Sequence, residues 1–333
     1  MVKTSIVVTT IFEPNEVIHK LVDISCKNNI RFFIAGDKKT PNSYHNLDCN
    51  FMPLTYQNKS YQKFSQSLPL NHYVRKNISY LESFKSGAER IIETDDDNYP
   101  LENFLSRTTE KLECDVVSGS QWINAYKFFT DDKIIWPRGY PLEKIKDEST
   151  LKKDNNFVNA PIQQGLANNN PDVDAIFRMV YQLPFVFNET DDIALDEFCW
   201  CPFNSQVTTW FKNAFPLMYL PSTCTFRMTD IWRSFIAQRI LWENQSKLLF
   251  HSASVKQKRN EHNLLKDFKD EVPGYQNNQL IIDYLTNLKL KKGWNNTIDN
   301  MFTCYEKLIS IKIFEPKEIE ILTNWSLALE DIY

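Results

Sequence analysis

The sequence lacks the glycine-rich loops with which many proteins hold phosphate groups. Neither GxGxxG nor GxxxxGK[ST] occurs in its 333 residues, which disfavours dinucleotide oxidoreductases and P-loop ATPases. GxSxG and HExxH are absent as well, so the sequence does not indicate an ordinary serine hydrolase or a zincin metalloprotease. Any binding of phosphate therefore has to come from other side chains.

The sequence also has no large excess of charge, no paired cysteine motif and no long apolar run. Its formal net charge of −4 argues against a general nucleic-acid-binding protein. Seven cysteines, an odd number without CxxC spacing, fit a reducing compartment better than a disulfide framework. Because no charged-then-apolar leader precedes Ser5 and no stretch is long enough to span a bilayer, we expect a cytoplasmic protein without a transmembrane segment.

Apolar periodicity in the first half of the chain is typical of βαβ units. Short apolar runs at 5–8 and 31–35 predict buried strands, and the amphipathic stretch between them predicts a helix. Further on, the pattern predicts a helix from about 68 to Gly87, a strand at 91–92, a helix at 101–112 and a strand at 115–119, whereas 43–70 has no clear period and is expected to be loop. The whole predicts an α/β fold with a parallel sheet.

The second half is less regular and then becomes helical. An amphipathic helix capped by Thr229 and Asp230 is expected, followed by a last strand at 248–251 that ends in His251. Beyond Glu261 we expect helical segments, with breaks at Pro273-Gly274 and at 289–293. This change of pattern divides the chain into an α/β domain at 1–260 and a helical C-terminal extension at 261–333.

Three consecutive carboxylates, Asp95, Asp96 and Asp97, directly follow the strand at 91–92. Like charges so close together repel one another and lose solvation, but a divalent cation such as Mg²⁺ or Mn²⁺ would stabilise them and bridge to phosphates. In an open α/β sheet, ligands bind just outside the carboxyl ends of the strands, where this triplet is expected. The alternative is a solvated acidic turn before Pro100.

Other polar side chains are predicted to follow strands at the same edge of the sheet. Thr9, Thr10 and Asp37 stand where a nucleoside would rest in a doubly wound sheet, and Lys256, Lys258 and Arg259 form a basic cluster after the last strand. Carboxylates and an imidazole around a metal, with basic residues nearby, suit a diphosphate. The residues therefore favour a nucleotide-sugar enzyme, in which a metal neutralises the leaving diphosphate.

Several short motifs in this chain resemble a known family in order and approximate spacing. VVTTIFEP, AGDKKTP, LPLNHYVRKNISY, ETDDDN, RMTDIWRSFIAQRILWE and FHSASVKQKRNEH are similar to the glycosyltransferase-like domain of the plant Golgi STELLO proteins. A fainter similarity, through TDDDN, RGYP, QGL…NPDVDA, TDIW and FHSAS, extends to the UDP-arabinopyranose mutases, also called reversibly glycosylated polypeptides. Both families imply a GT-A-type (Rossmann-like) fold, in which a mixed, mostly parallel sheet is flanked by helices, together with a UDP-sugar donor and a divalent metal, commonly Mn²⁺.

The resemblance also implies roles for particular residues of this chain. Asp97 is the expected main metal ligand, with Asp95 and with His251 as the late histidine ligand. Asp230 is the expected general base, with a helix N-cap as the alternative, and Arg138 matches the arginine that becomes glycosylated in the mutases or faces the sugar. The residues expected to hold the nucleotide-sugar, with solvated surface charge as the alternative for the basic ones, are Thr9, Thr10, Ile11, Asp37, Lys38, Arg75, Lys76, Asp95, Asp96, Lys256 and Arg259.

Together these features predict a metal-dependent glycosyltransferase that moves a sugar from a UDP-sugar to a hydroxyl acceptor of unknown identity, a glycan or another molecule. Two alternatives stay open. One is a nucleotide-sugar mutase, although the mutases lack the helical stretch after Glu261. The other is a scaffold protein that binds a nucleotide-sugar without turnover. The STELLO proteins carry an N-terminal cytosolic and membrane-anchor portion that this chain does not show, so their Golgi location is not expected to transfer.

Overall fold

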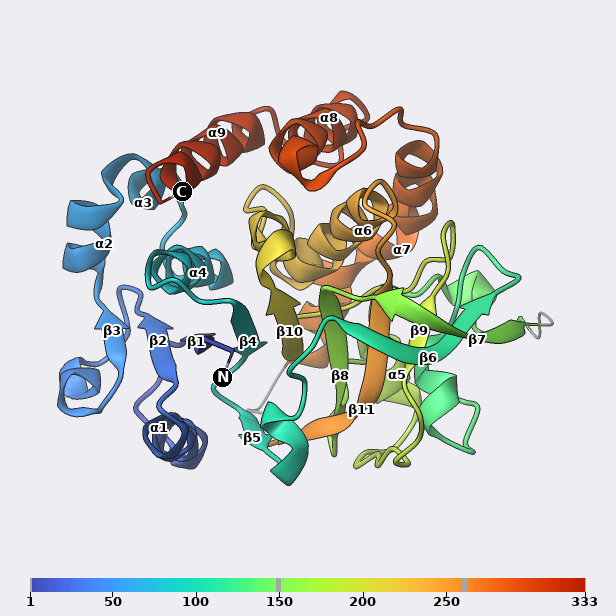
Figure 1. Cartoon of the computed structure of the whole chain (residues 1–333), viewed down its shortest axis with the longest axis horizontal. Helices are drawn as coiled ribbons and strands as arrows, with labels where there is room; N and C mark the ends of the chain where they lie inside the picture. The colour runs from blue at the N-terminus through green and yellow to red at the C-terminus, as the bar shows by residue number, and fades with distance from the viewer. Residues whose placement is uncertain (1, 148–150, 259–262, 333) are drawn as a thin grey trace.

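The computed structural model describes residues 2–147, 151–258 and 263–332. Within them, eleven strands form one mixed sheet in the order β3-β2-β1-β4-β10-β8-β11-β9-β6-β7, with β5 paired to β11 (Figure 1). The strands are β1 (Thr4–Thr9), β2 (Arg31–Ala35), β3 (Asn50–Met52), β4 (Arg90–Thr94), β5 (Asn98–Pro100), β6 (Lys111–Ser118), β7 (Lys152–Asn159), β8 (Ile162–Asn168), β9 (Ile193–Leu195), β10 (Val207–Phe211) and β11 (Leu248–Gln257).

Helices cover both faces of this sheet. The α-helices are α1 (Glu16–Asn28), α2 (Leu54–Ser60), α3 (Gln62–Ser67), α4 (Lys76–Lys85), α5 (Ala175–Val180), α6 (Thr229–Trp242), α7 (Leu264–Thr286), α8 (Thr297–Ser310) and α9 (Lys317–Glu330). Short 3₁₀ helices are η1 (Asn42–Asn46), η2 (Tyr73–Arg75), η3 (Glu102–Leu105), η4 (Ala125–Phe129), η5 (Leu142–Lys144), η6 (Lys212–Met218), η7 (Phe226–Met228) and η8 (Trp294–Asn296).

Strand direction confirms the predicted α/β class with a mixed, mostly parallel sheet flanked by helices. β3, β2, β1 and β4 are mutually parallel, and β10 separates them from the parallel pair of β8 and β11. Because β2 and β3 lie on one side of β1 and β4 lies on the other, the strand order reverses beside β1. Such a switch point leaves room for a ligand at the carboxyl ends of the strands.

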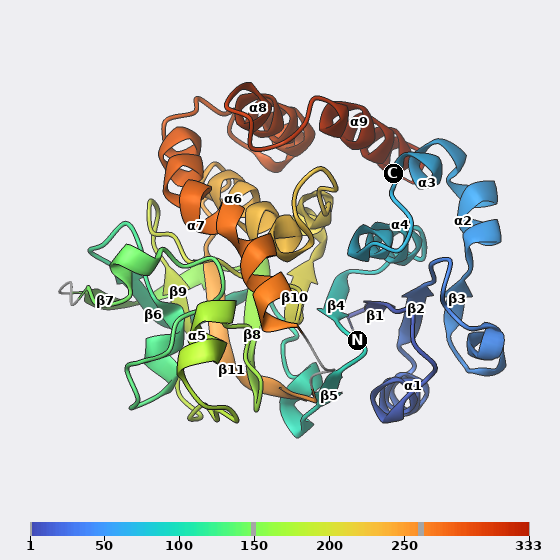
Figure 2. The same ribbon diagram turned by 180° about the vertical axis from the view of Figure 1, so that it is seen from behind.

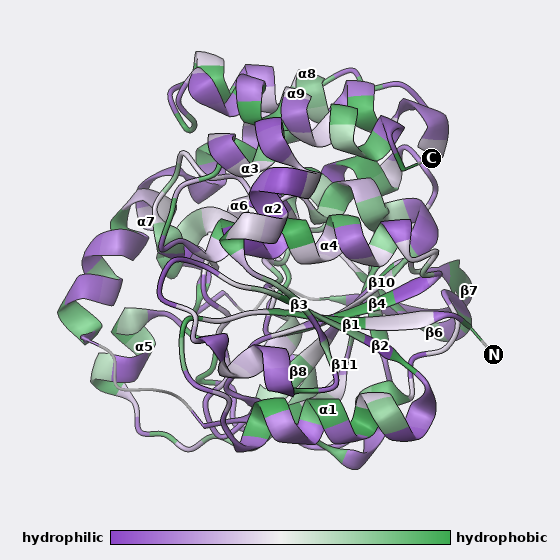
Figure 3. Cartoon of the chain, turned by 90° about the vertical axis from the view of Figure 1, so that its left-hand side faces the viewer, coloured by the Kyte–Doolittle hydropathy of each residue, from purple (hydrophilic) through white to green (hydrophobic). Residues whose placement is uncertain are grey.

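The alternation of side chains along β1 distributes the core between two layers. Ile6 and Val8 join the cluster that includes Val17 and Leu21 of α1, whereas Val7 joins the larger cluster that includes Ile78 of α4. Successive strand residues point to opposite faces of a sheet, so an uninterrupted apolar run is needed where both faces are covered. Figure 3 shows α1 on one face of the sheet and α4 on the other.

The C-terminal helices pack onto the α/β core rather than standing apart from it. Trp325 of α9 is fully buried, contacts the rings of Phe64, Phe84 and Tyr219, and donates to the carbonyl oxygen of Pro216 at 3.2 Å. Figures 1 and 2 show α8 and α9 as an outer layer over α6 and α4, with α9 reaching α3 near the start of the chain. The extension therefore closes one side of the core.

Three of the predicted elements are wrong. The expected loop at 43–70 contains α2, α3, η1 and β3, which are too short to show a period in the sequence. The expected helix at 101–112 is η3 followed by the start of β6. Contacts with β11 hold this segment, because the amide of Leu101 donates to Ser254 and the side chain of Asn103 donates to Ala253.

The third error is the break expected at Pro273-Gly274. Helix α7 continues through Pro273, and Gly274 lies against Met228, where a Cβ would collide with the sulfur. The glycine here allows two elements to approach closely instead of ending a helix. The break expected at 289–293 is confirmed, since α7 ends at Thr286 and η8 begins at Trp294.

None of the helices in the described part of the chain combines the length and the apolar content that crossing a bilayer requires.

The buried position of Trp325 makes the contribution of α9 to stability measurable. We expect Trp325→Ala to lower the free energy of unfolding by about 3–5 kcal/mol, because it leaves a cavity in the core. Leu327→Ala, on the same helix but 43% exposed, should cost less than about 1 kcal/mol. Urea unfolding followed by circular dichroism checks this, and equal losses in the two variants would contradict the packing described.

Candidate functional site

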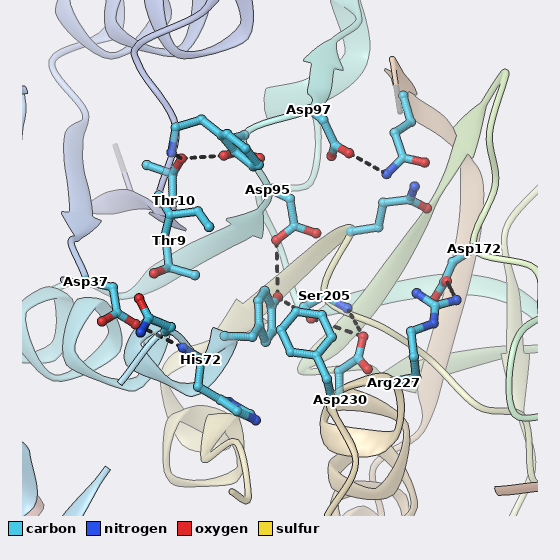
Figure 4. A pocket seen from close by; sticks show the side chains of 18 of the residues that line it. Thr9, Thr10, Asp37, His72, Asp95, Asp97, Asp172, Ser205, Arg227 and Asp230 are labelled. Carbon is cyan, nitrogen blue, oxygen red and sulfur yellow. Dashed lines mark hydrogen bonds and ion pairs between the residues drawn. The ribbon is translucent and has the colours of Figure 1, made fainter. Parts of the chain in front are cut away.

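A cavity of about 450 Å³ lies at the carboxyl ends of β1, β2 and β4, beside the switch point. Figure 4 shows side chains from these strand ends facing others from α6 and η7 across it. It is lined by Thr9, Thr10, Ile11, Phe12, Asp37, Asn71, His72, Tyr73, Asp95, Asp96, Asp97, Arg138, Asp172, Ser205, Gln206, Phe226, Arg227, Asp230 and Gln257. The structure therefore brings together the acidic triplet, the end of the first strand and Asp230, as the sequence predicts.

Asp95 is the most deeply held carboxylate of the triplet. Its Oδ1 accepts from Lys76 Nζ at 2.7 Å and from the Tyr73 hydroxyl at 3.2 Å. Burial raises its pKa, and the charge of Lys76 opposes that effect. Lys76 itself is fully buried and also lies 3.9 Å from Glu93. One lysine thus lies between two carboxylates beneath the cavity.

The other two carboxylates of the triplet face different partners. Asp96 accepts from the Thr10 hydroxyl, and burial raises its pKa to about 6. Asp97 accepts from Gln257 Nε2 at 3.0 Å. The loop after β4 therefore joins the ends of β1 and β11 through these two contacts.

Opposite the triplet, Asp230 forms a buried ion pair with Arg138. The guanidinium donates to both carboxylate oxygens of Asp230, at 3.0 and 2.8 Å, and to both of Asp172, at 2.8 and 2.7 Å. Burial by itself would raise the pKa of Asp230, but the charge and hydrogen bonds of Arg138 outweigh it and lower that pKa to about 2. Asp230 is therefore an ionised acceptor that holds a proton only weakly.

The two sides of the cavity are connected through Tyr73 and Ser205. The Tyr73 hydroxyl lies 2.5 Å from Ser205 Oγ, and Ser205 Oγ lies 3.2 Å from Asp230 Oδ2. Since the Tyr73 hydroxyl also lies 3.2 Å from Asp95 Oδ1, a row of close polar contacts runs from the triplet to Asp230 (Figure 4).

The helix-cap alternative for Asp230 is not what the structure shows. Helix α6 begins at Thr229 after Met228 and has no side-chain capping bond, so the predicted cap by Thr229 and Asp230 is wrong. The carboxylate of Asp230 is turned instead toward Arg138 and Ser205. Arg138 and Asp230, both predicted as catalytic, thus lie in direct contact.

Arg75 and Lys76 do not line the cavity. Arg75 is buried and donates to the carbonyl oxygens of Pro69, Ser65 and Leu68. It closes the turn before α4 and is not aimed at a nucleotide. Lys76 contacts the site only through its ion pair with Asp95, which itself lines the cavity.

His251 is also placed apart from the triplet, because β11 is longer than predicted. The strand continues to Gln257, so His251 lies in its interior, packed against Gly165 and with Nδ1 2.9 Å from the Ser252 carbonyl oxygen. Burial and the charge of Arg107 lower the pKa of His251 to about 3. The residue that meets Asp97 at the true end of the strand is Gln257.

The remaining basic residues of the prediction lie outside the cavity or outside the described residues. Lys38 is exposed, and only its backbone amide approaches the site, donating to Asp37 at 2.6 Å. Lys256 Nζ lies over the ring of Tyr99 at 4.9 Å. Arg259 falls outside the described residues.

The predicted metal ligands Asp95, Asp97 and His251 are not assembled into one group. Among the described residues, no cluster of three or more His, Cys, Asp or Glu side chains is arranged to hold a metal ion. One observation nevertheless fits a hard cation: the buried Oε1 of Gln257, next to Asp97, has no hydrogen-bond partner within the described part of the chain. An amide oxygen beside a carboxylate is the oxygen chemistry that Mg²⁺ and Mn²⁺ accept.

Several lining residues were missed by the sequence reasoning. Gln257 was missed because β11 is longer than its apolar pattern predicts. Ser205 was missed because it precedes β10, a strand that no pattern indicated. Asp172 and Arg227 stand inside the motifs NPDVDA and RMTDIW, which supplied the only signal for them. Phe226, just before Arg227, carried no signal.

The fold and the cavity together define an α/β protein with a Rossmann-like sheet and an acidic site at its switch point. The profile of the STELLO glycosyltransferases matches residues 227–332, and so runs through α7, α8 and α9. "Probable glycosyltransferase STELLO2" and "Probable glycosyltransferase STELLO1" of Arabidopsis thaliana are each 26% identical to this chain, over 259 and 258 residues. The chain is thus similar to the STELLO glycosyltransferases, as its motifs indicate.

These matches cover 72% of this chain and 33% of each relative, so the chain spans about a third of the length of the relatives it matches. Among solved structures, a crystal structure of a mycobacterial protein has a TM-score of 0.45 at 8% identity, over 84% of this chain and 74% of that one. That likeness is too low to indicate a shared function.

The buried Lys76 between Asp95 and Glu93 predicts a large energetic coupling. We expect Lys76→Met to lower the free energy of unfolding by about 3–5 kcal/mol, since it leaves Asp95 without its cation, whereas Glu93 keeps Arg233 at 2.9 Å. Adding Asp95→Asn should recover about 1 kcal/mol or more. Lys144→Met, in an exposed pair with Asp147, is the matched control and should cost less than about 1 kcal/mol. Additive losses in the double variant, measured by urea unfolding, would contradict the coupling.

Proposed function

We propose that this protein is a glycosyltransferase that binds a UDP-sugar with a divalent cation and transfers the sugar to a hydroxyl acceptor. The observation that carries the proposal is a single cavity in which the acidic triplet after β4 faces Asp230 at the switch point of the sheet. Its similarity to proteins named glycosyltransferases supports the same reaction class.

The donor is proposed to occupy the side formed by the strand ends. Thr9, Thr10 and Asp37 lie at the ends of β1 and β2, where a nucleoside fits an α/β sheet. Asp97 would hold the cation, together with the neighbouring Oε1 of Gln257, which has no hydrogen-bond partner among the residues that the structure describes. When bound, such a cation neutralises the charge that develops on a leaving diphosphate.

The acceptor is proposed to approach from the side of Asp230. The ionised carboxylate accepts a hydrogen bond from the attacking hydroxyl and so orients it. Because its pKa is lowered to about 2, Asp230 takes the proton only as the new bond to the sugar carbon forms and the hydroxyl becomes acidic. Arg138 fixes the orientation of this carboxylate and keeps it charged.

The geometry of Arg138 disfavours the mutase alternative. A glycosylated arginine needs a free guanidinium nitrogen, but Nε, Nη1 and Nη2 of Arg138 each donate to Asp172, Asp230 or the Arg227 carbonyl oxygen. Freeing one nitrogen would leave buried carboxylates unpaired, which is costly. The remaining alternative, a scaffold without turnover, would show metal-dependent binding of UDP and no transfer.

Metal-dependent binding of UDP tests the donor side directly. We expect Asp97→Asn to weaken the binding of UDP in Mn²⁺ by about a hundredfold or more, because the carboxylate that would meet the cation is lost. His251→Gln should leave the affinity within about threefold, since His251 lies in the interior of β11 away from the carboxylates. Isothermal titration calorimetry with and without Mn²⁺ gives both numbers.

The wild-type chain and a stability check complete this experiment. Both variants should unfold at a temperature close to that of the wild type, which separates lost binding from lost folding. Unchanged affinity in Asp97→Asn, or no binding of UDP by the wild type with any of Mn²⁺, Mg²⁺ or chelator, would overturn the proposed function.

A further inference from the structure

Phe226 is a large apolar side chain left open inside the cavity, on the side of Asp230, whereas the other exposed apolar residues of the lining, Ile11 and Phe12, follow β1. It is 48% exposed, while the two residues that follow it on η7, Arg227 and Met228, are buried. Single exposed apolar residues are common on protein surfaces. Phe226 differs from them in position, because it lines the cavity between the strand ends and Asp230.

The ring of Phe226 is fixed in place by aromatic neighbours. It meets His72 and Tyr73 edge-on, with ring centroids 5.6 and 5.9 Å apart. The hydroxyl of Tyr73 contacts Ser205, which contacts Asp230. Phe226 therefore lies beside the group proposed to orient the acceptor.

The backbone that carries Phe226 is anchored by the C-terminal helices. Glu318 of α9 is buried and accepts from the amides of Ser222 and Thr223, both at 3.1 Å or less. Glu271 of α7 is buried as well and accepts from Arg227 Nε and Nη2 at 2.9 and 2.8 Å. These contacts anchor the chain on both sides of Phe226, which favours one orientation of its ring.

Arg227, which lines the same cavity, keeps one donor without a partner in the described part of the chain. Its Nε and Nη2 are bound by Glu271, whereas Nη1 has no hydrogen-bond partner among residues 2–147, 151–258 and 263–332. The segment 226–230 thus offers an aromatic face, a guanidinium N–H and an ionised carboxylate within five consecutive positions.

We propose that Phe226 and Arg227 form an acceptor subsite for a carbohydrate, which rests on the glycosyltransferase function proposed above. One face of a pyranose ring carries C–H bonds and packs on the negative face of an aromatic ring. The hydroxyls at its edge pair with charged donors and acceptors, here Arg227 Nη1 and Asp230. Six aspartates line the same cavity and supply acceptors for hydroxyl groups, which favours a hydroxyl-bearing acceptor: Asp37, Asp95, Asp96, Asp97, Asp172 and Asp230.

Substitution of Phe226 tests whether its ring binds the acceptor saccharide or the nucleobase of the donor. The protein loaded with UDP and diamagnetic Mg²⁺ is probed by saturation-transfer NMR with a pool of methyl glycosides and disaccharides of the common pyranoses. Phe226→Ala should weaken the binding of the responding saccharide about tenfold, while the affinity for UDP stays within about twofold. Phe226→Trp should restore saccharide binding, and Phe157→Ala, at a 73% exposed phenylalanine on β7 outside the cavity, is the matched control.

The possible results separate the two proposals. A wild type that does not bind UDP overturns the proposed function. A wild type that binds UDP but no saccharide of the pool overturns only the acceptor subsite. The same follows if Phe226→Ala weakens UDP and saccharide equally, which would assign the ring to the nucleobase, or if Phe226→Ala and Phe157→Ala bind the saccharide equally well.

Discussion

The floor of the cavity is held by buried charges that alternate in sign. Lys76 separates Asp95 from Glu93, and Arg138 separates Asp230 from Asp172. Charges removed from water are stable only when partners of opposite sign lie within contact distance. The triplet at the end of β4 therefore depends on α4 for its cation, and Asp230 depends on the loop that carries Arg138. Each functional carboxylate is fixed in direction by the residue that neutralises it.

The same pairing of charges explains why the helices after residue 263 matter for the cavity. Without Glu271 of α7, Arg227 would lose its closest carboxylate, since Asp172 lies 3.9 Å from its Nη2 and is shared with Arg138. Glu318 of α9 likewise holds the backbone of 222–223, because it accepts hydrogen bonds from both amides. The profile match over 227–332 covers both the segment that lines the cavity and the helices that anchor it. The role proposed for the C-terminal helices is thus to fix one wall of the site.

The position of the acidic triplet in the candidate site could be predicted from the local sequence. Three carboxylates that follow a buried apolar pair repel one another unless a positive charge lies near them. The metal ligands were misplaced, because the length of β11 is fixed by pairing with β8 and β5 and not by its own apolar pattern. A strand longer by six residues moves the point of contact with Asp97 from His251 to Gln257. Basic residues were overestimated for a similar reason, since Arg75 and Lys76 were expected to be ligands or surface charge, whereas both are buried partners of the fold.

The amino-acid sequence by itself determined the α/β class, the order of the first strands and helices, and the presence of carboxylates at the strand ends. These depend on apolar periodicity and on residues adjacent in the chain, which act over short distances. Only the tertiary structure decided which charges face one another. Arg138 meets Asp230 across 92 positions, and Asp97 meets Gln257 across 160. Such pairings are set by the packing of the sheet against α6 and α7, so a local sequence pattern cannot predict them.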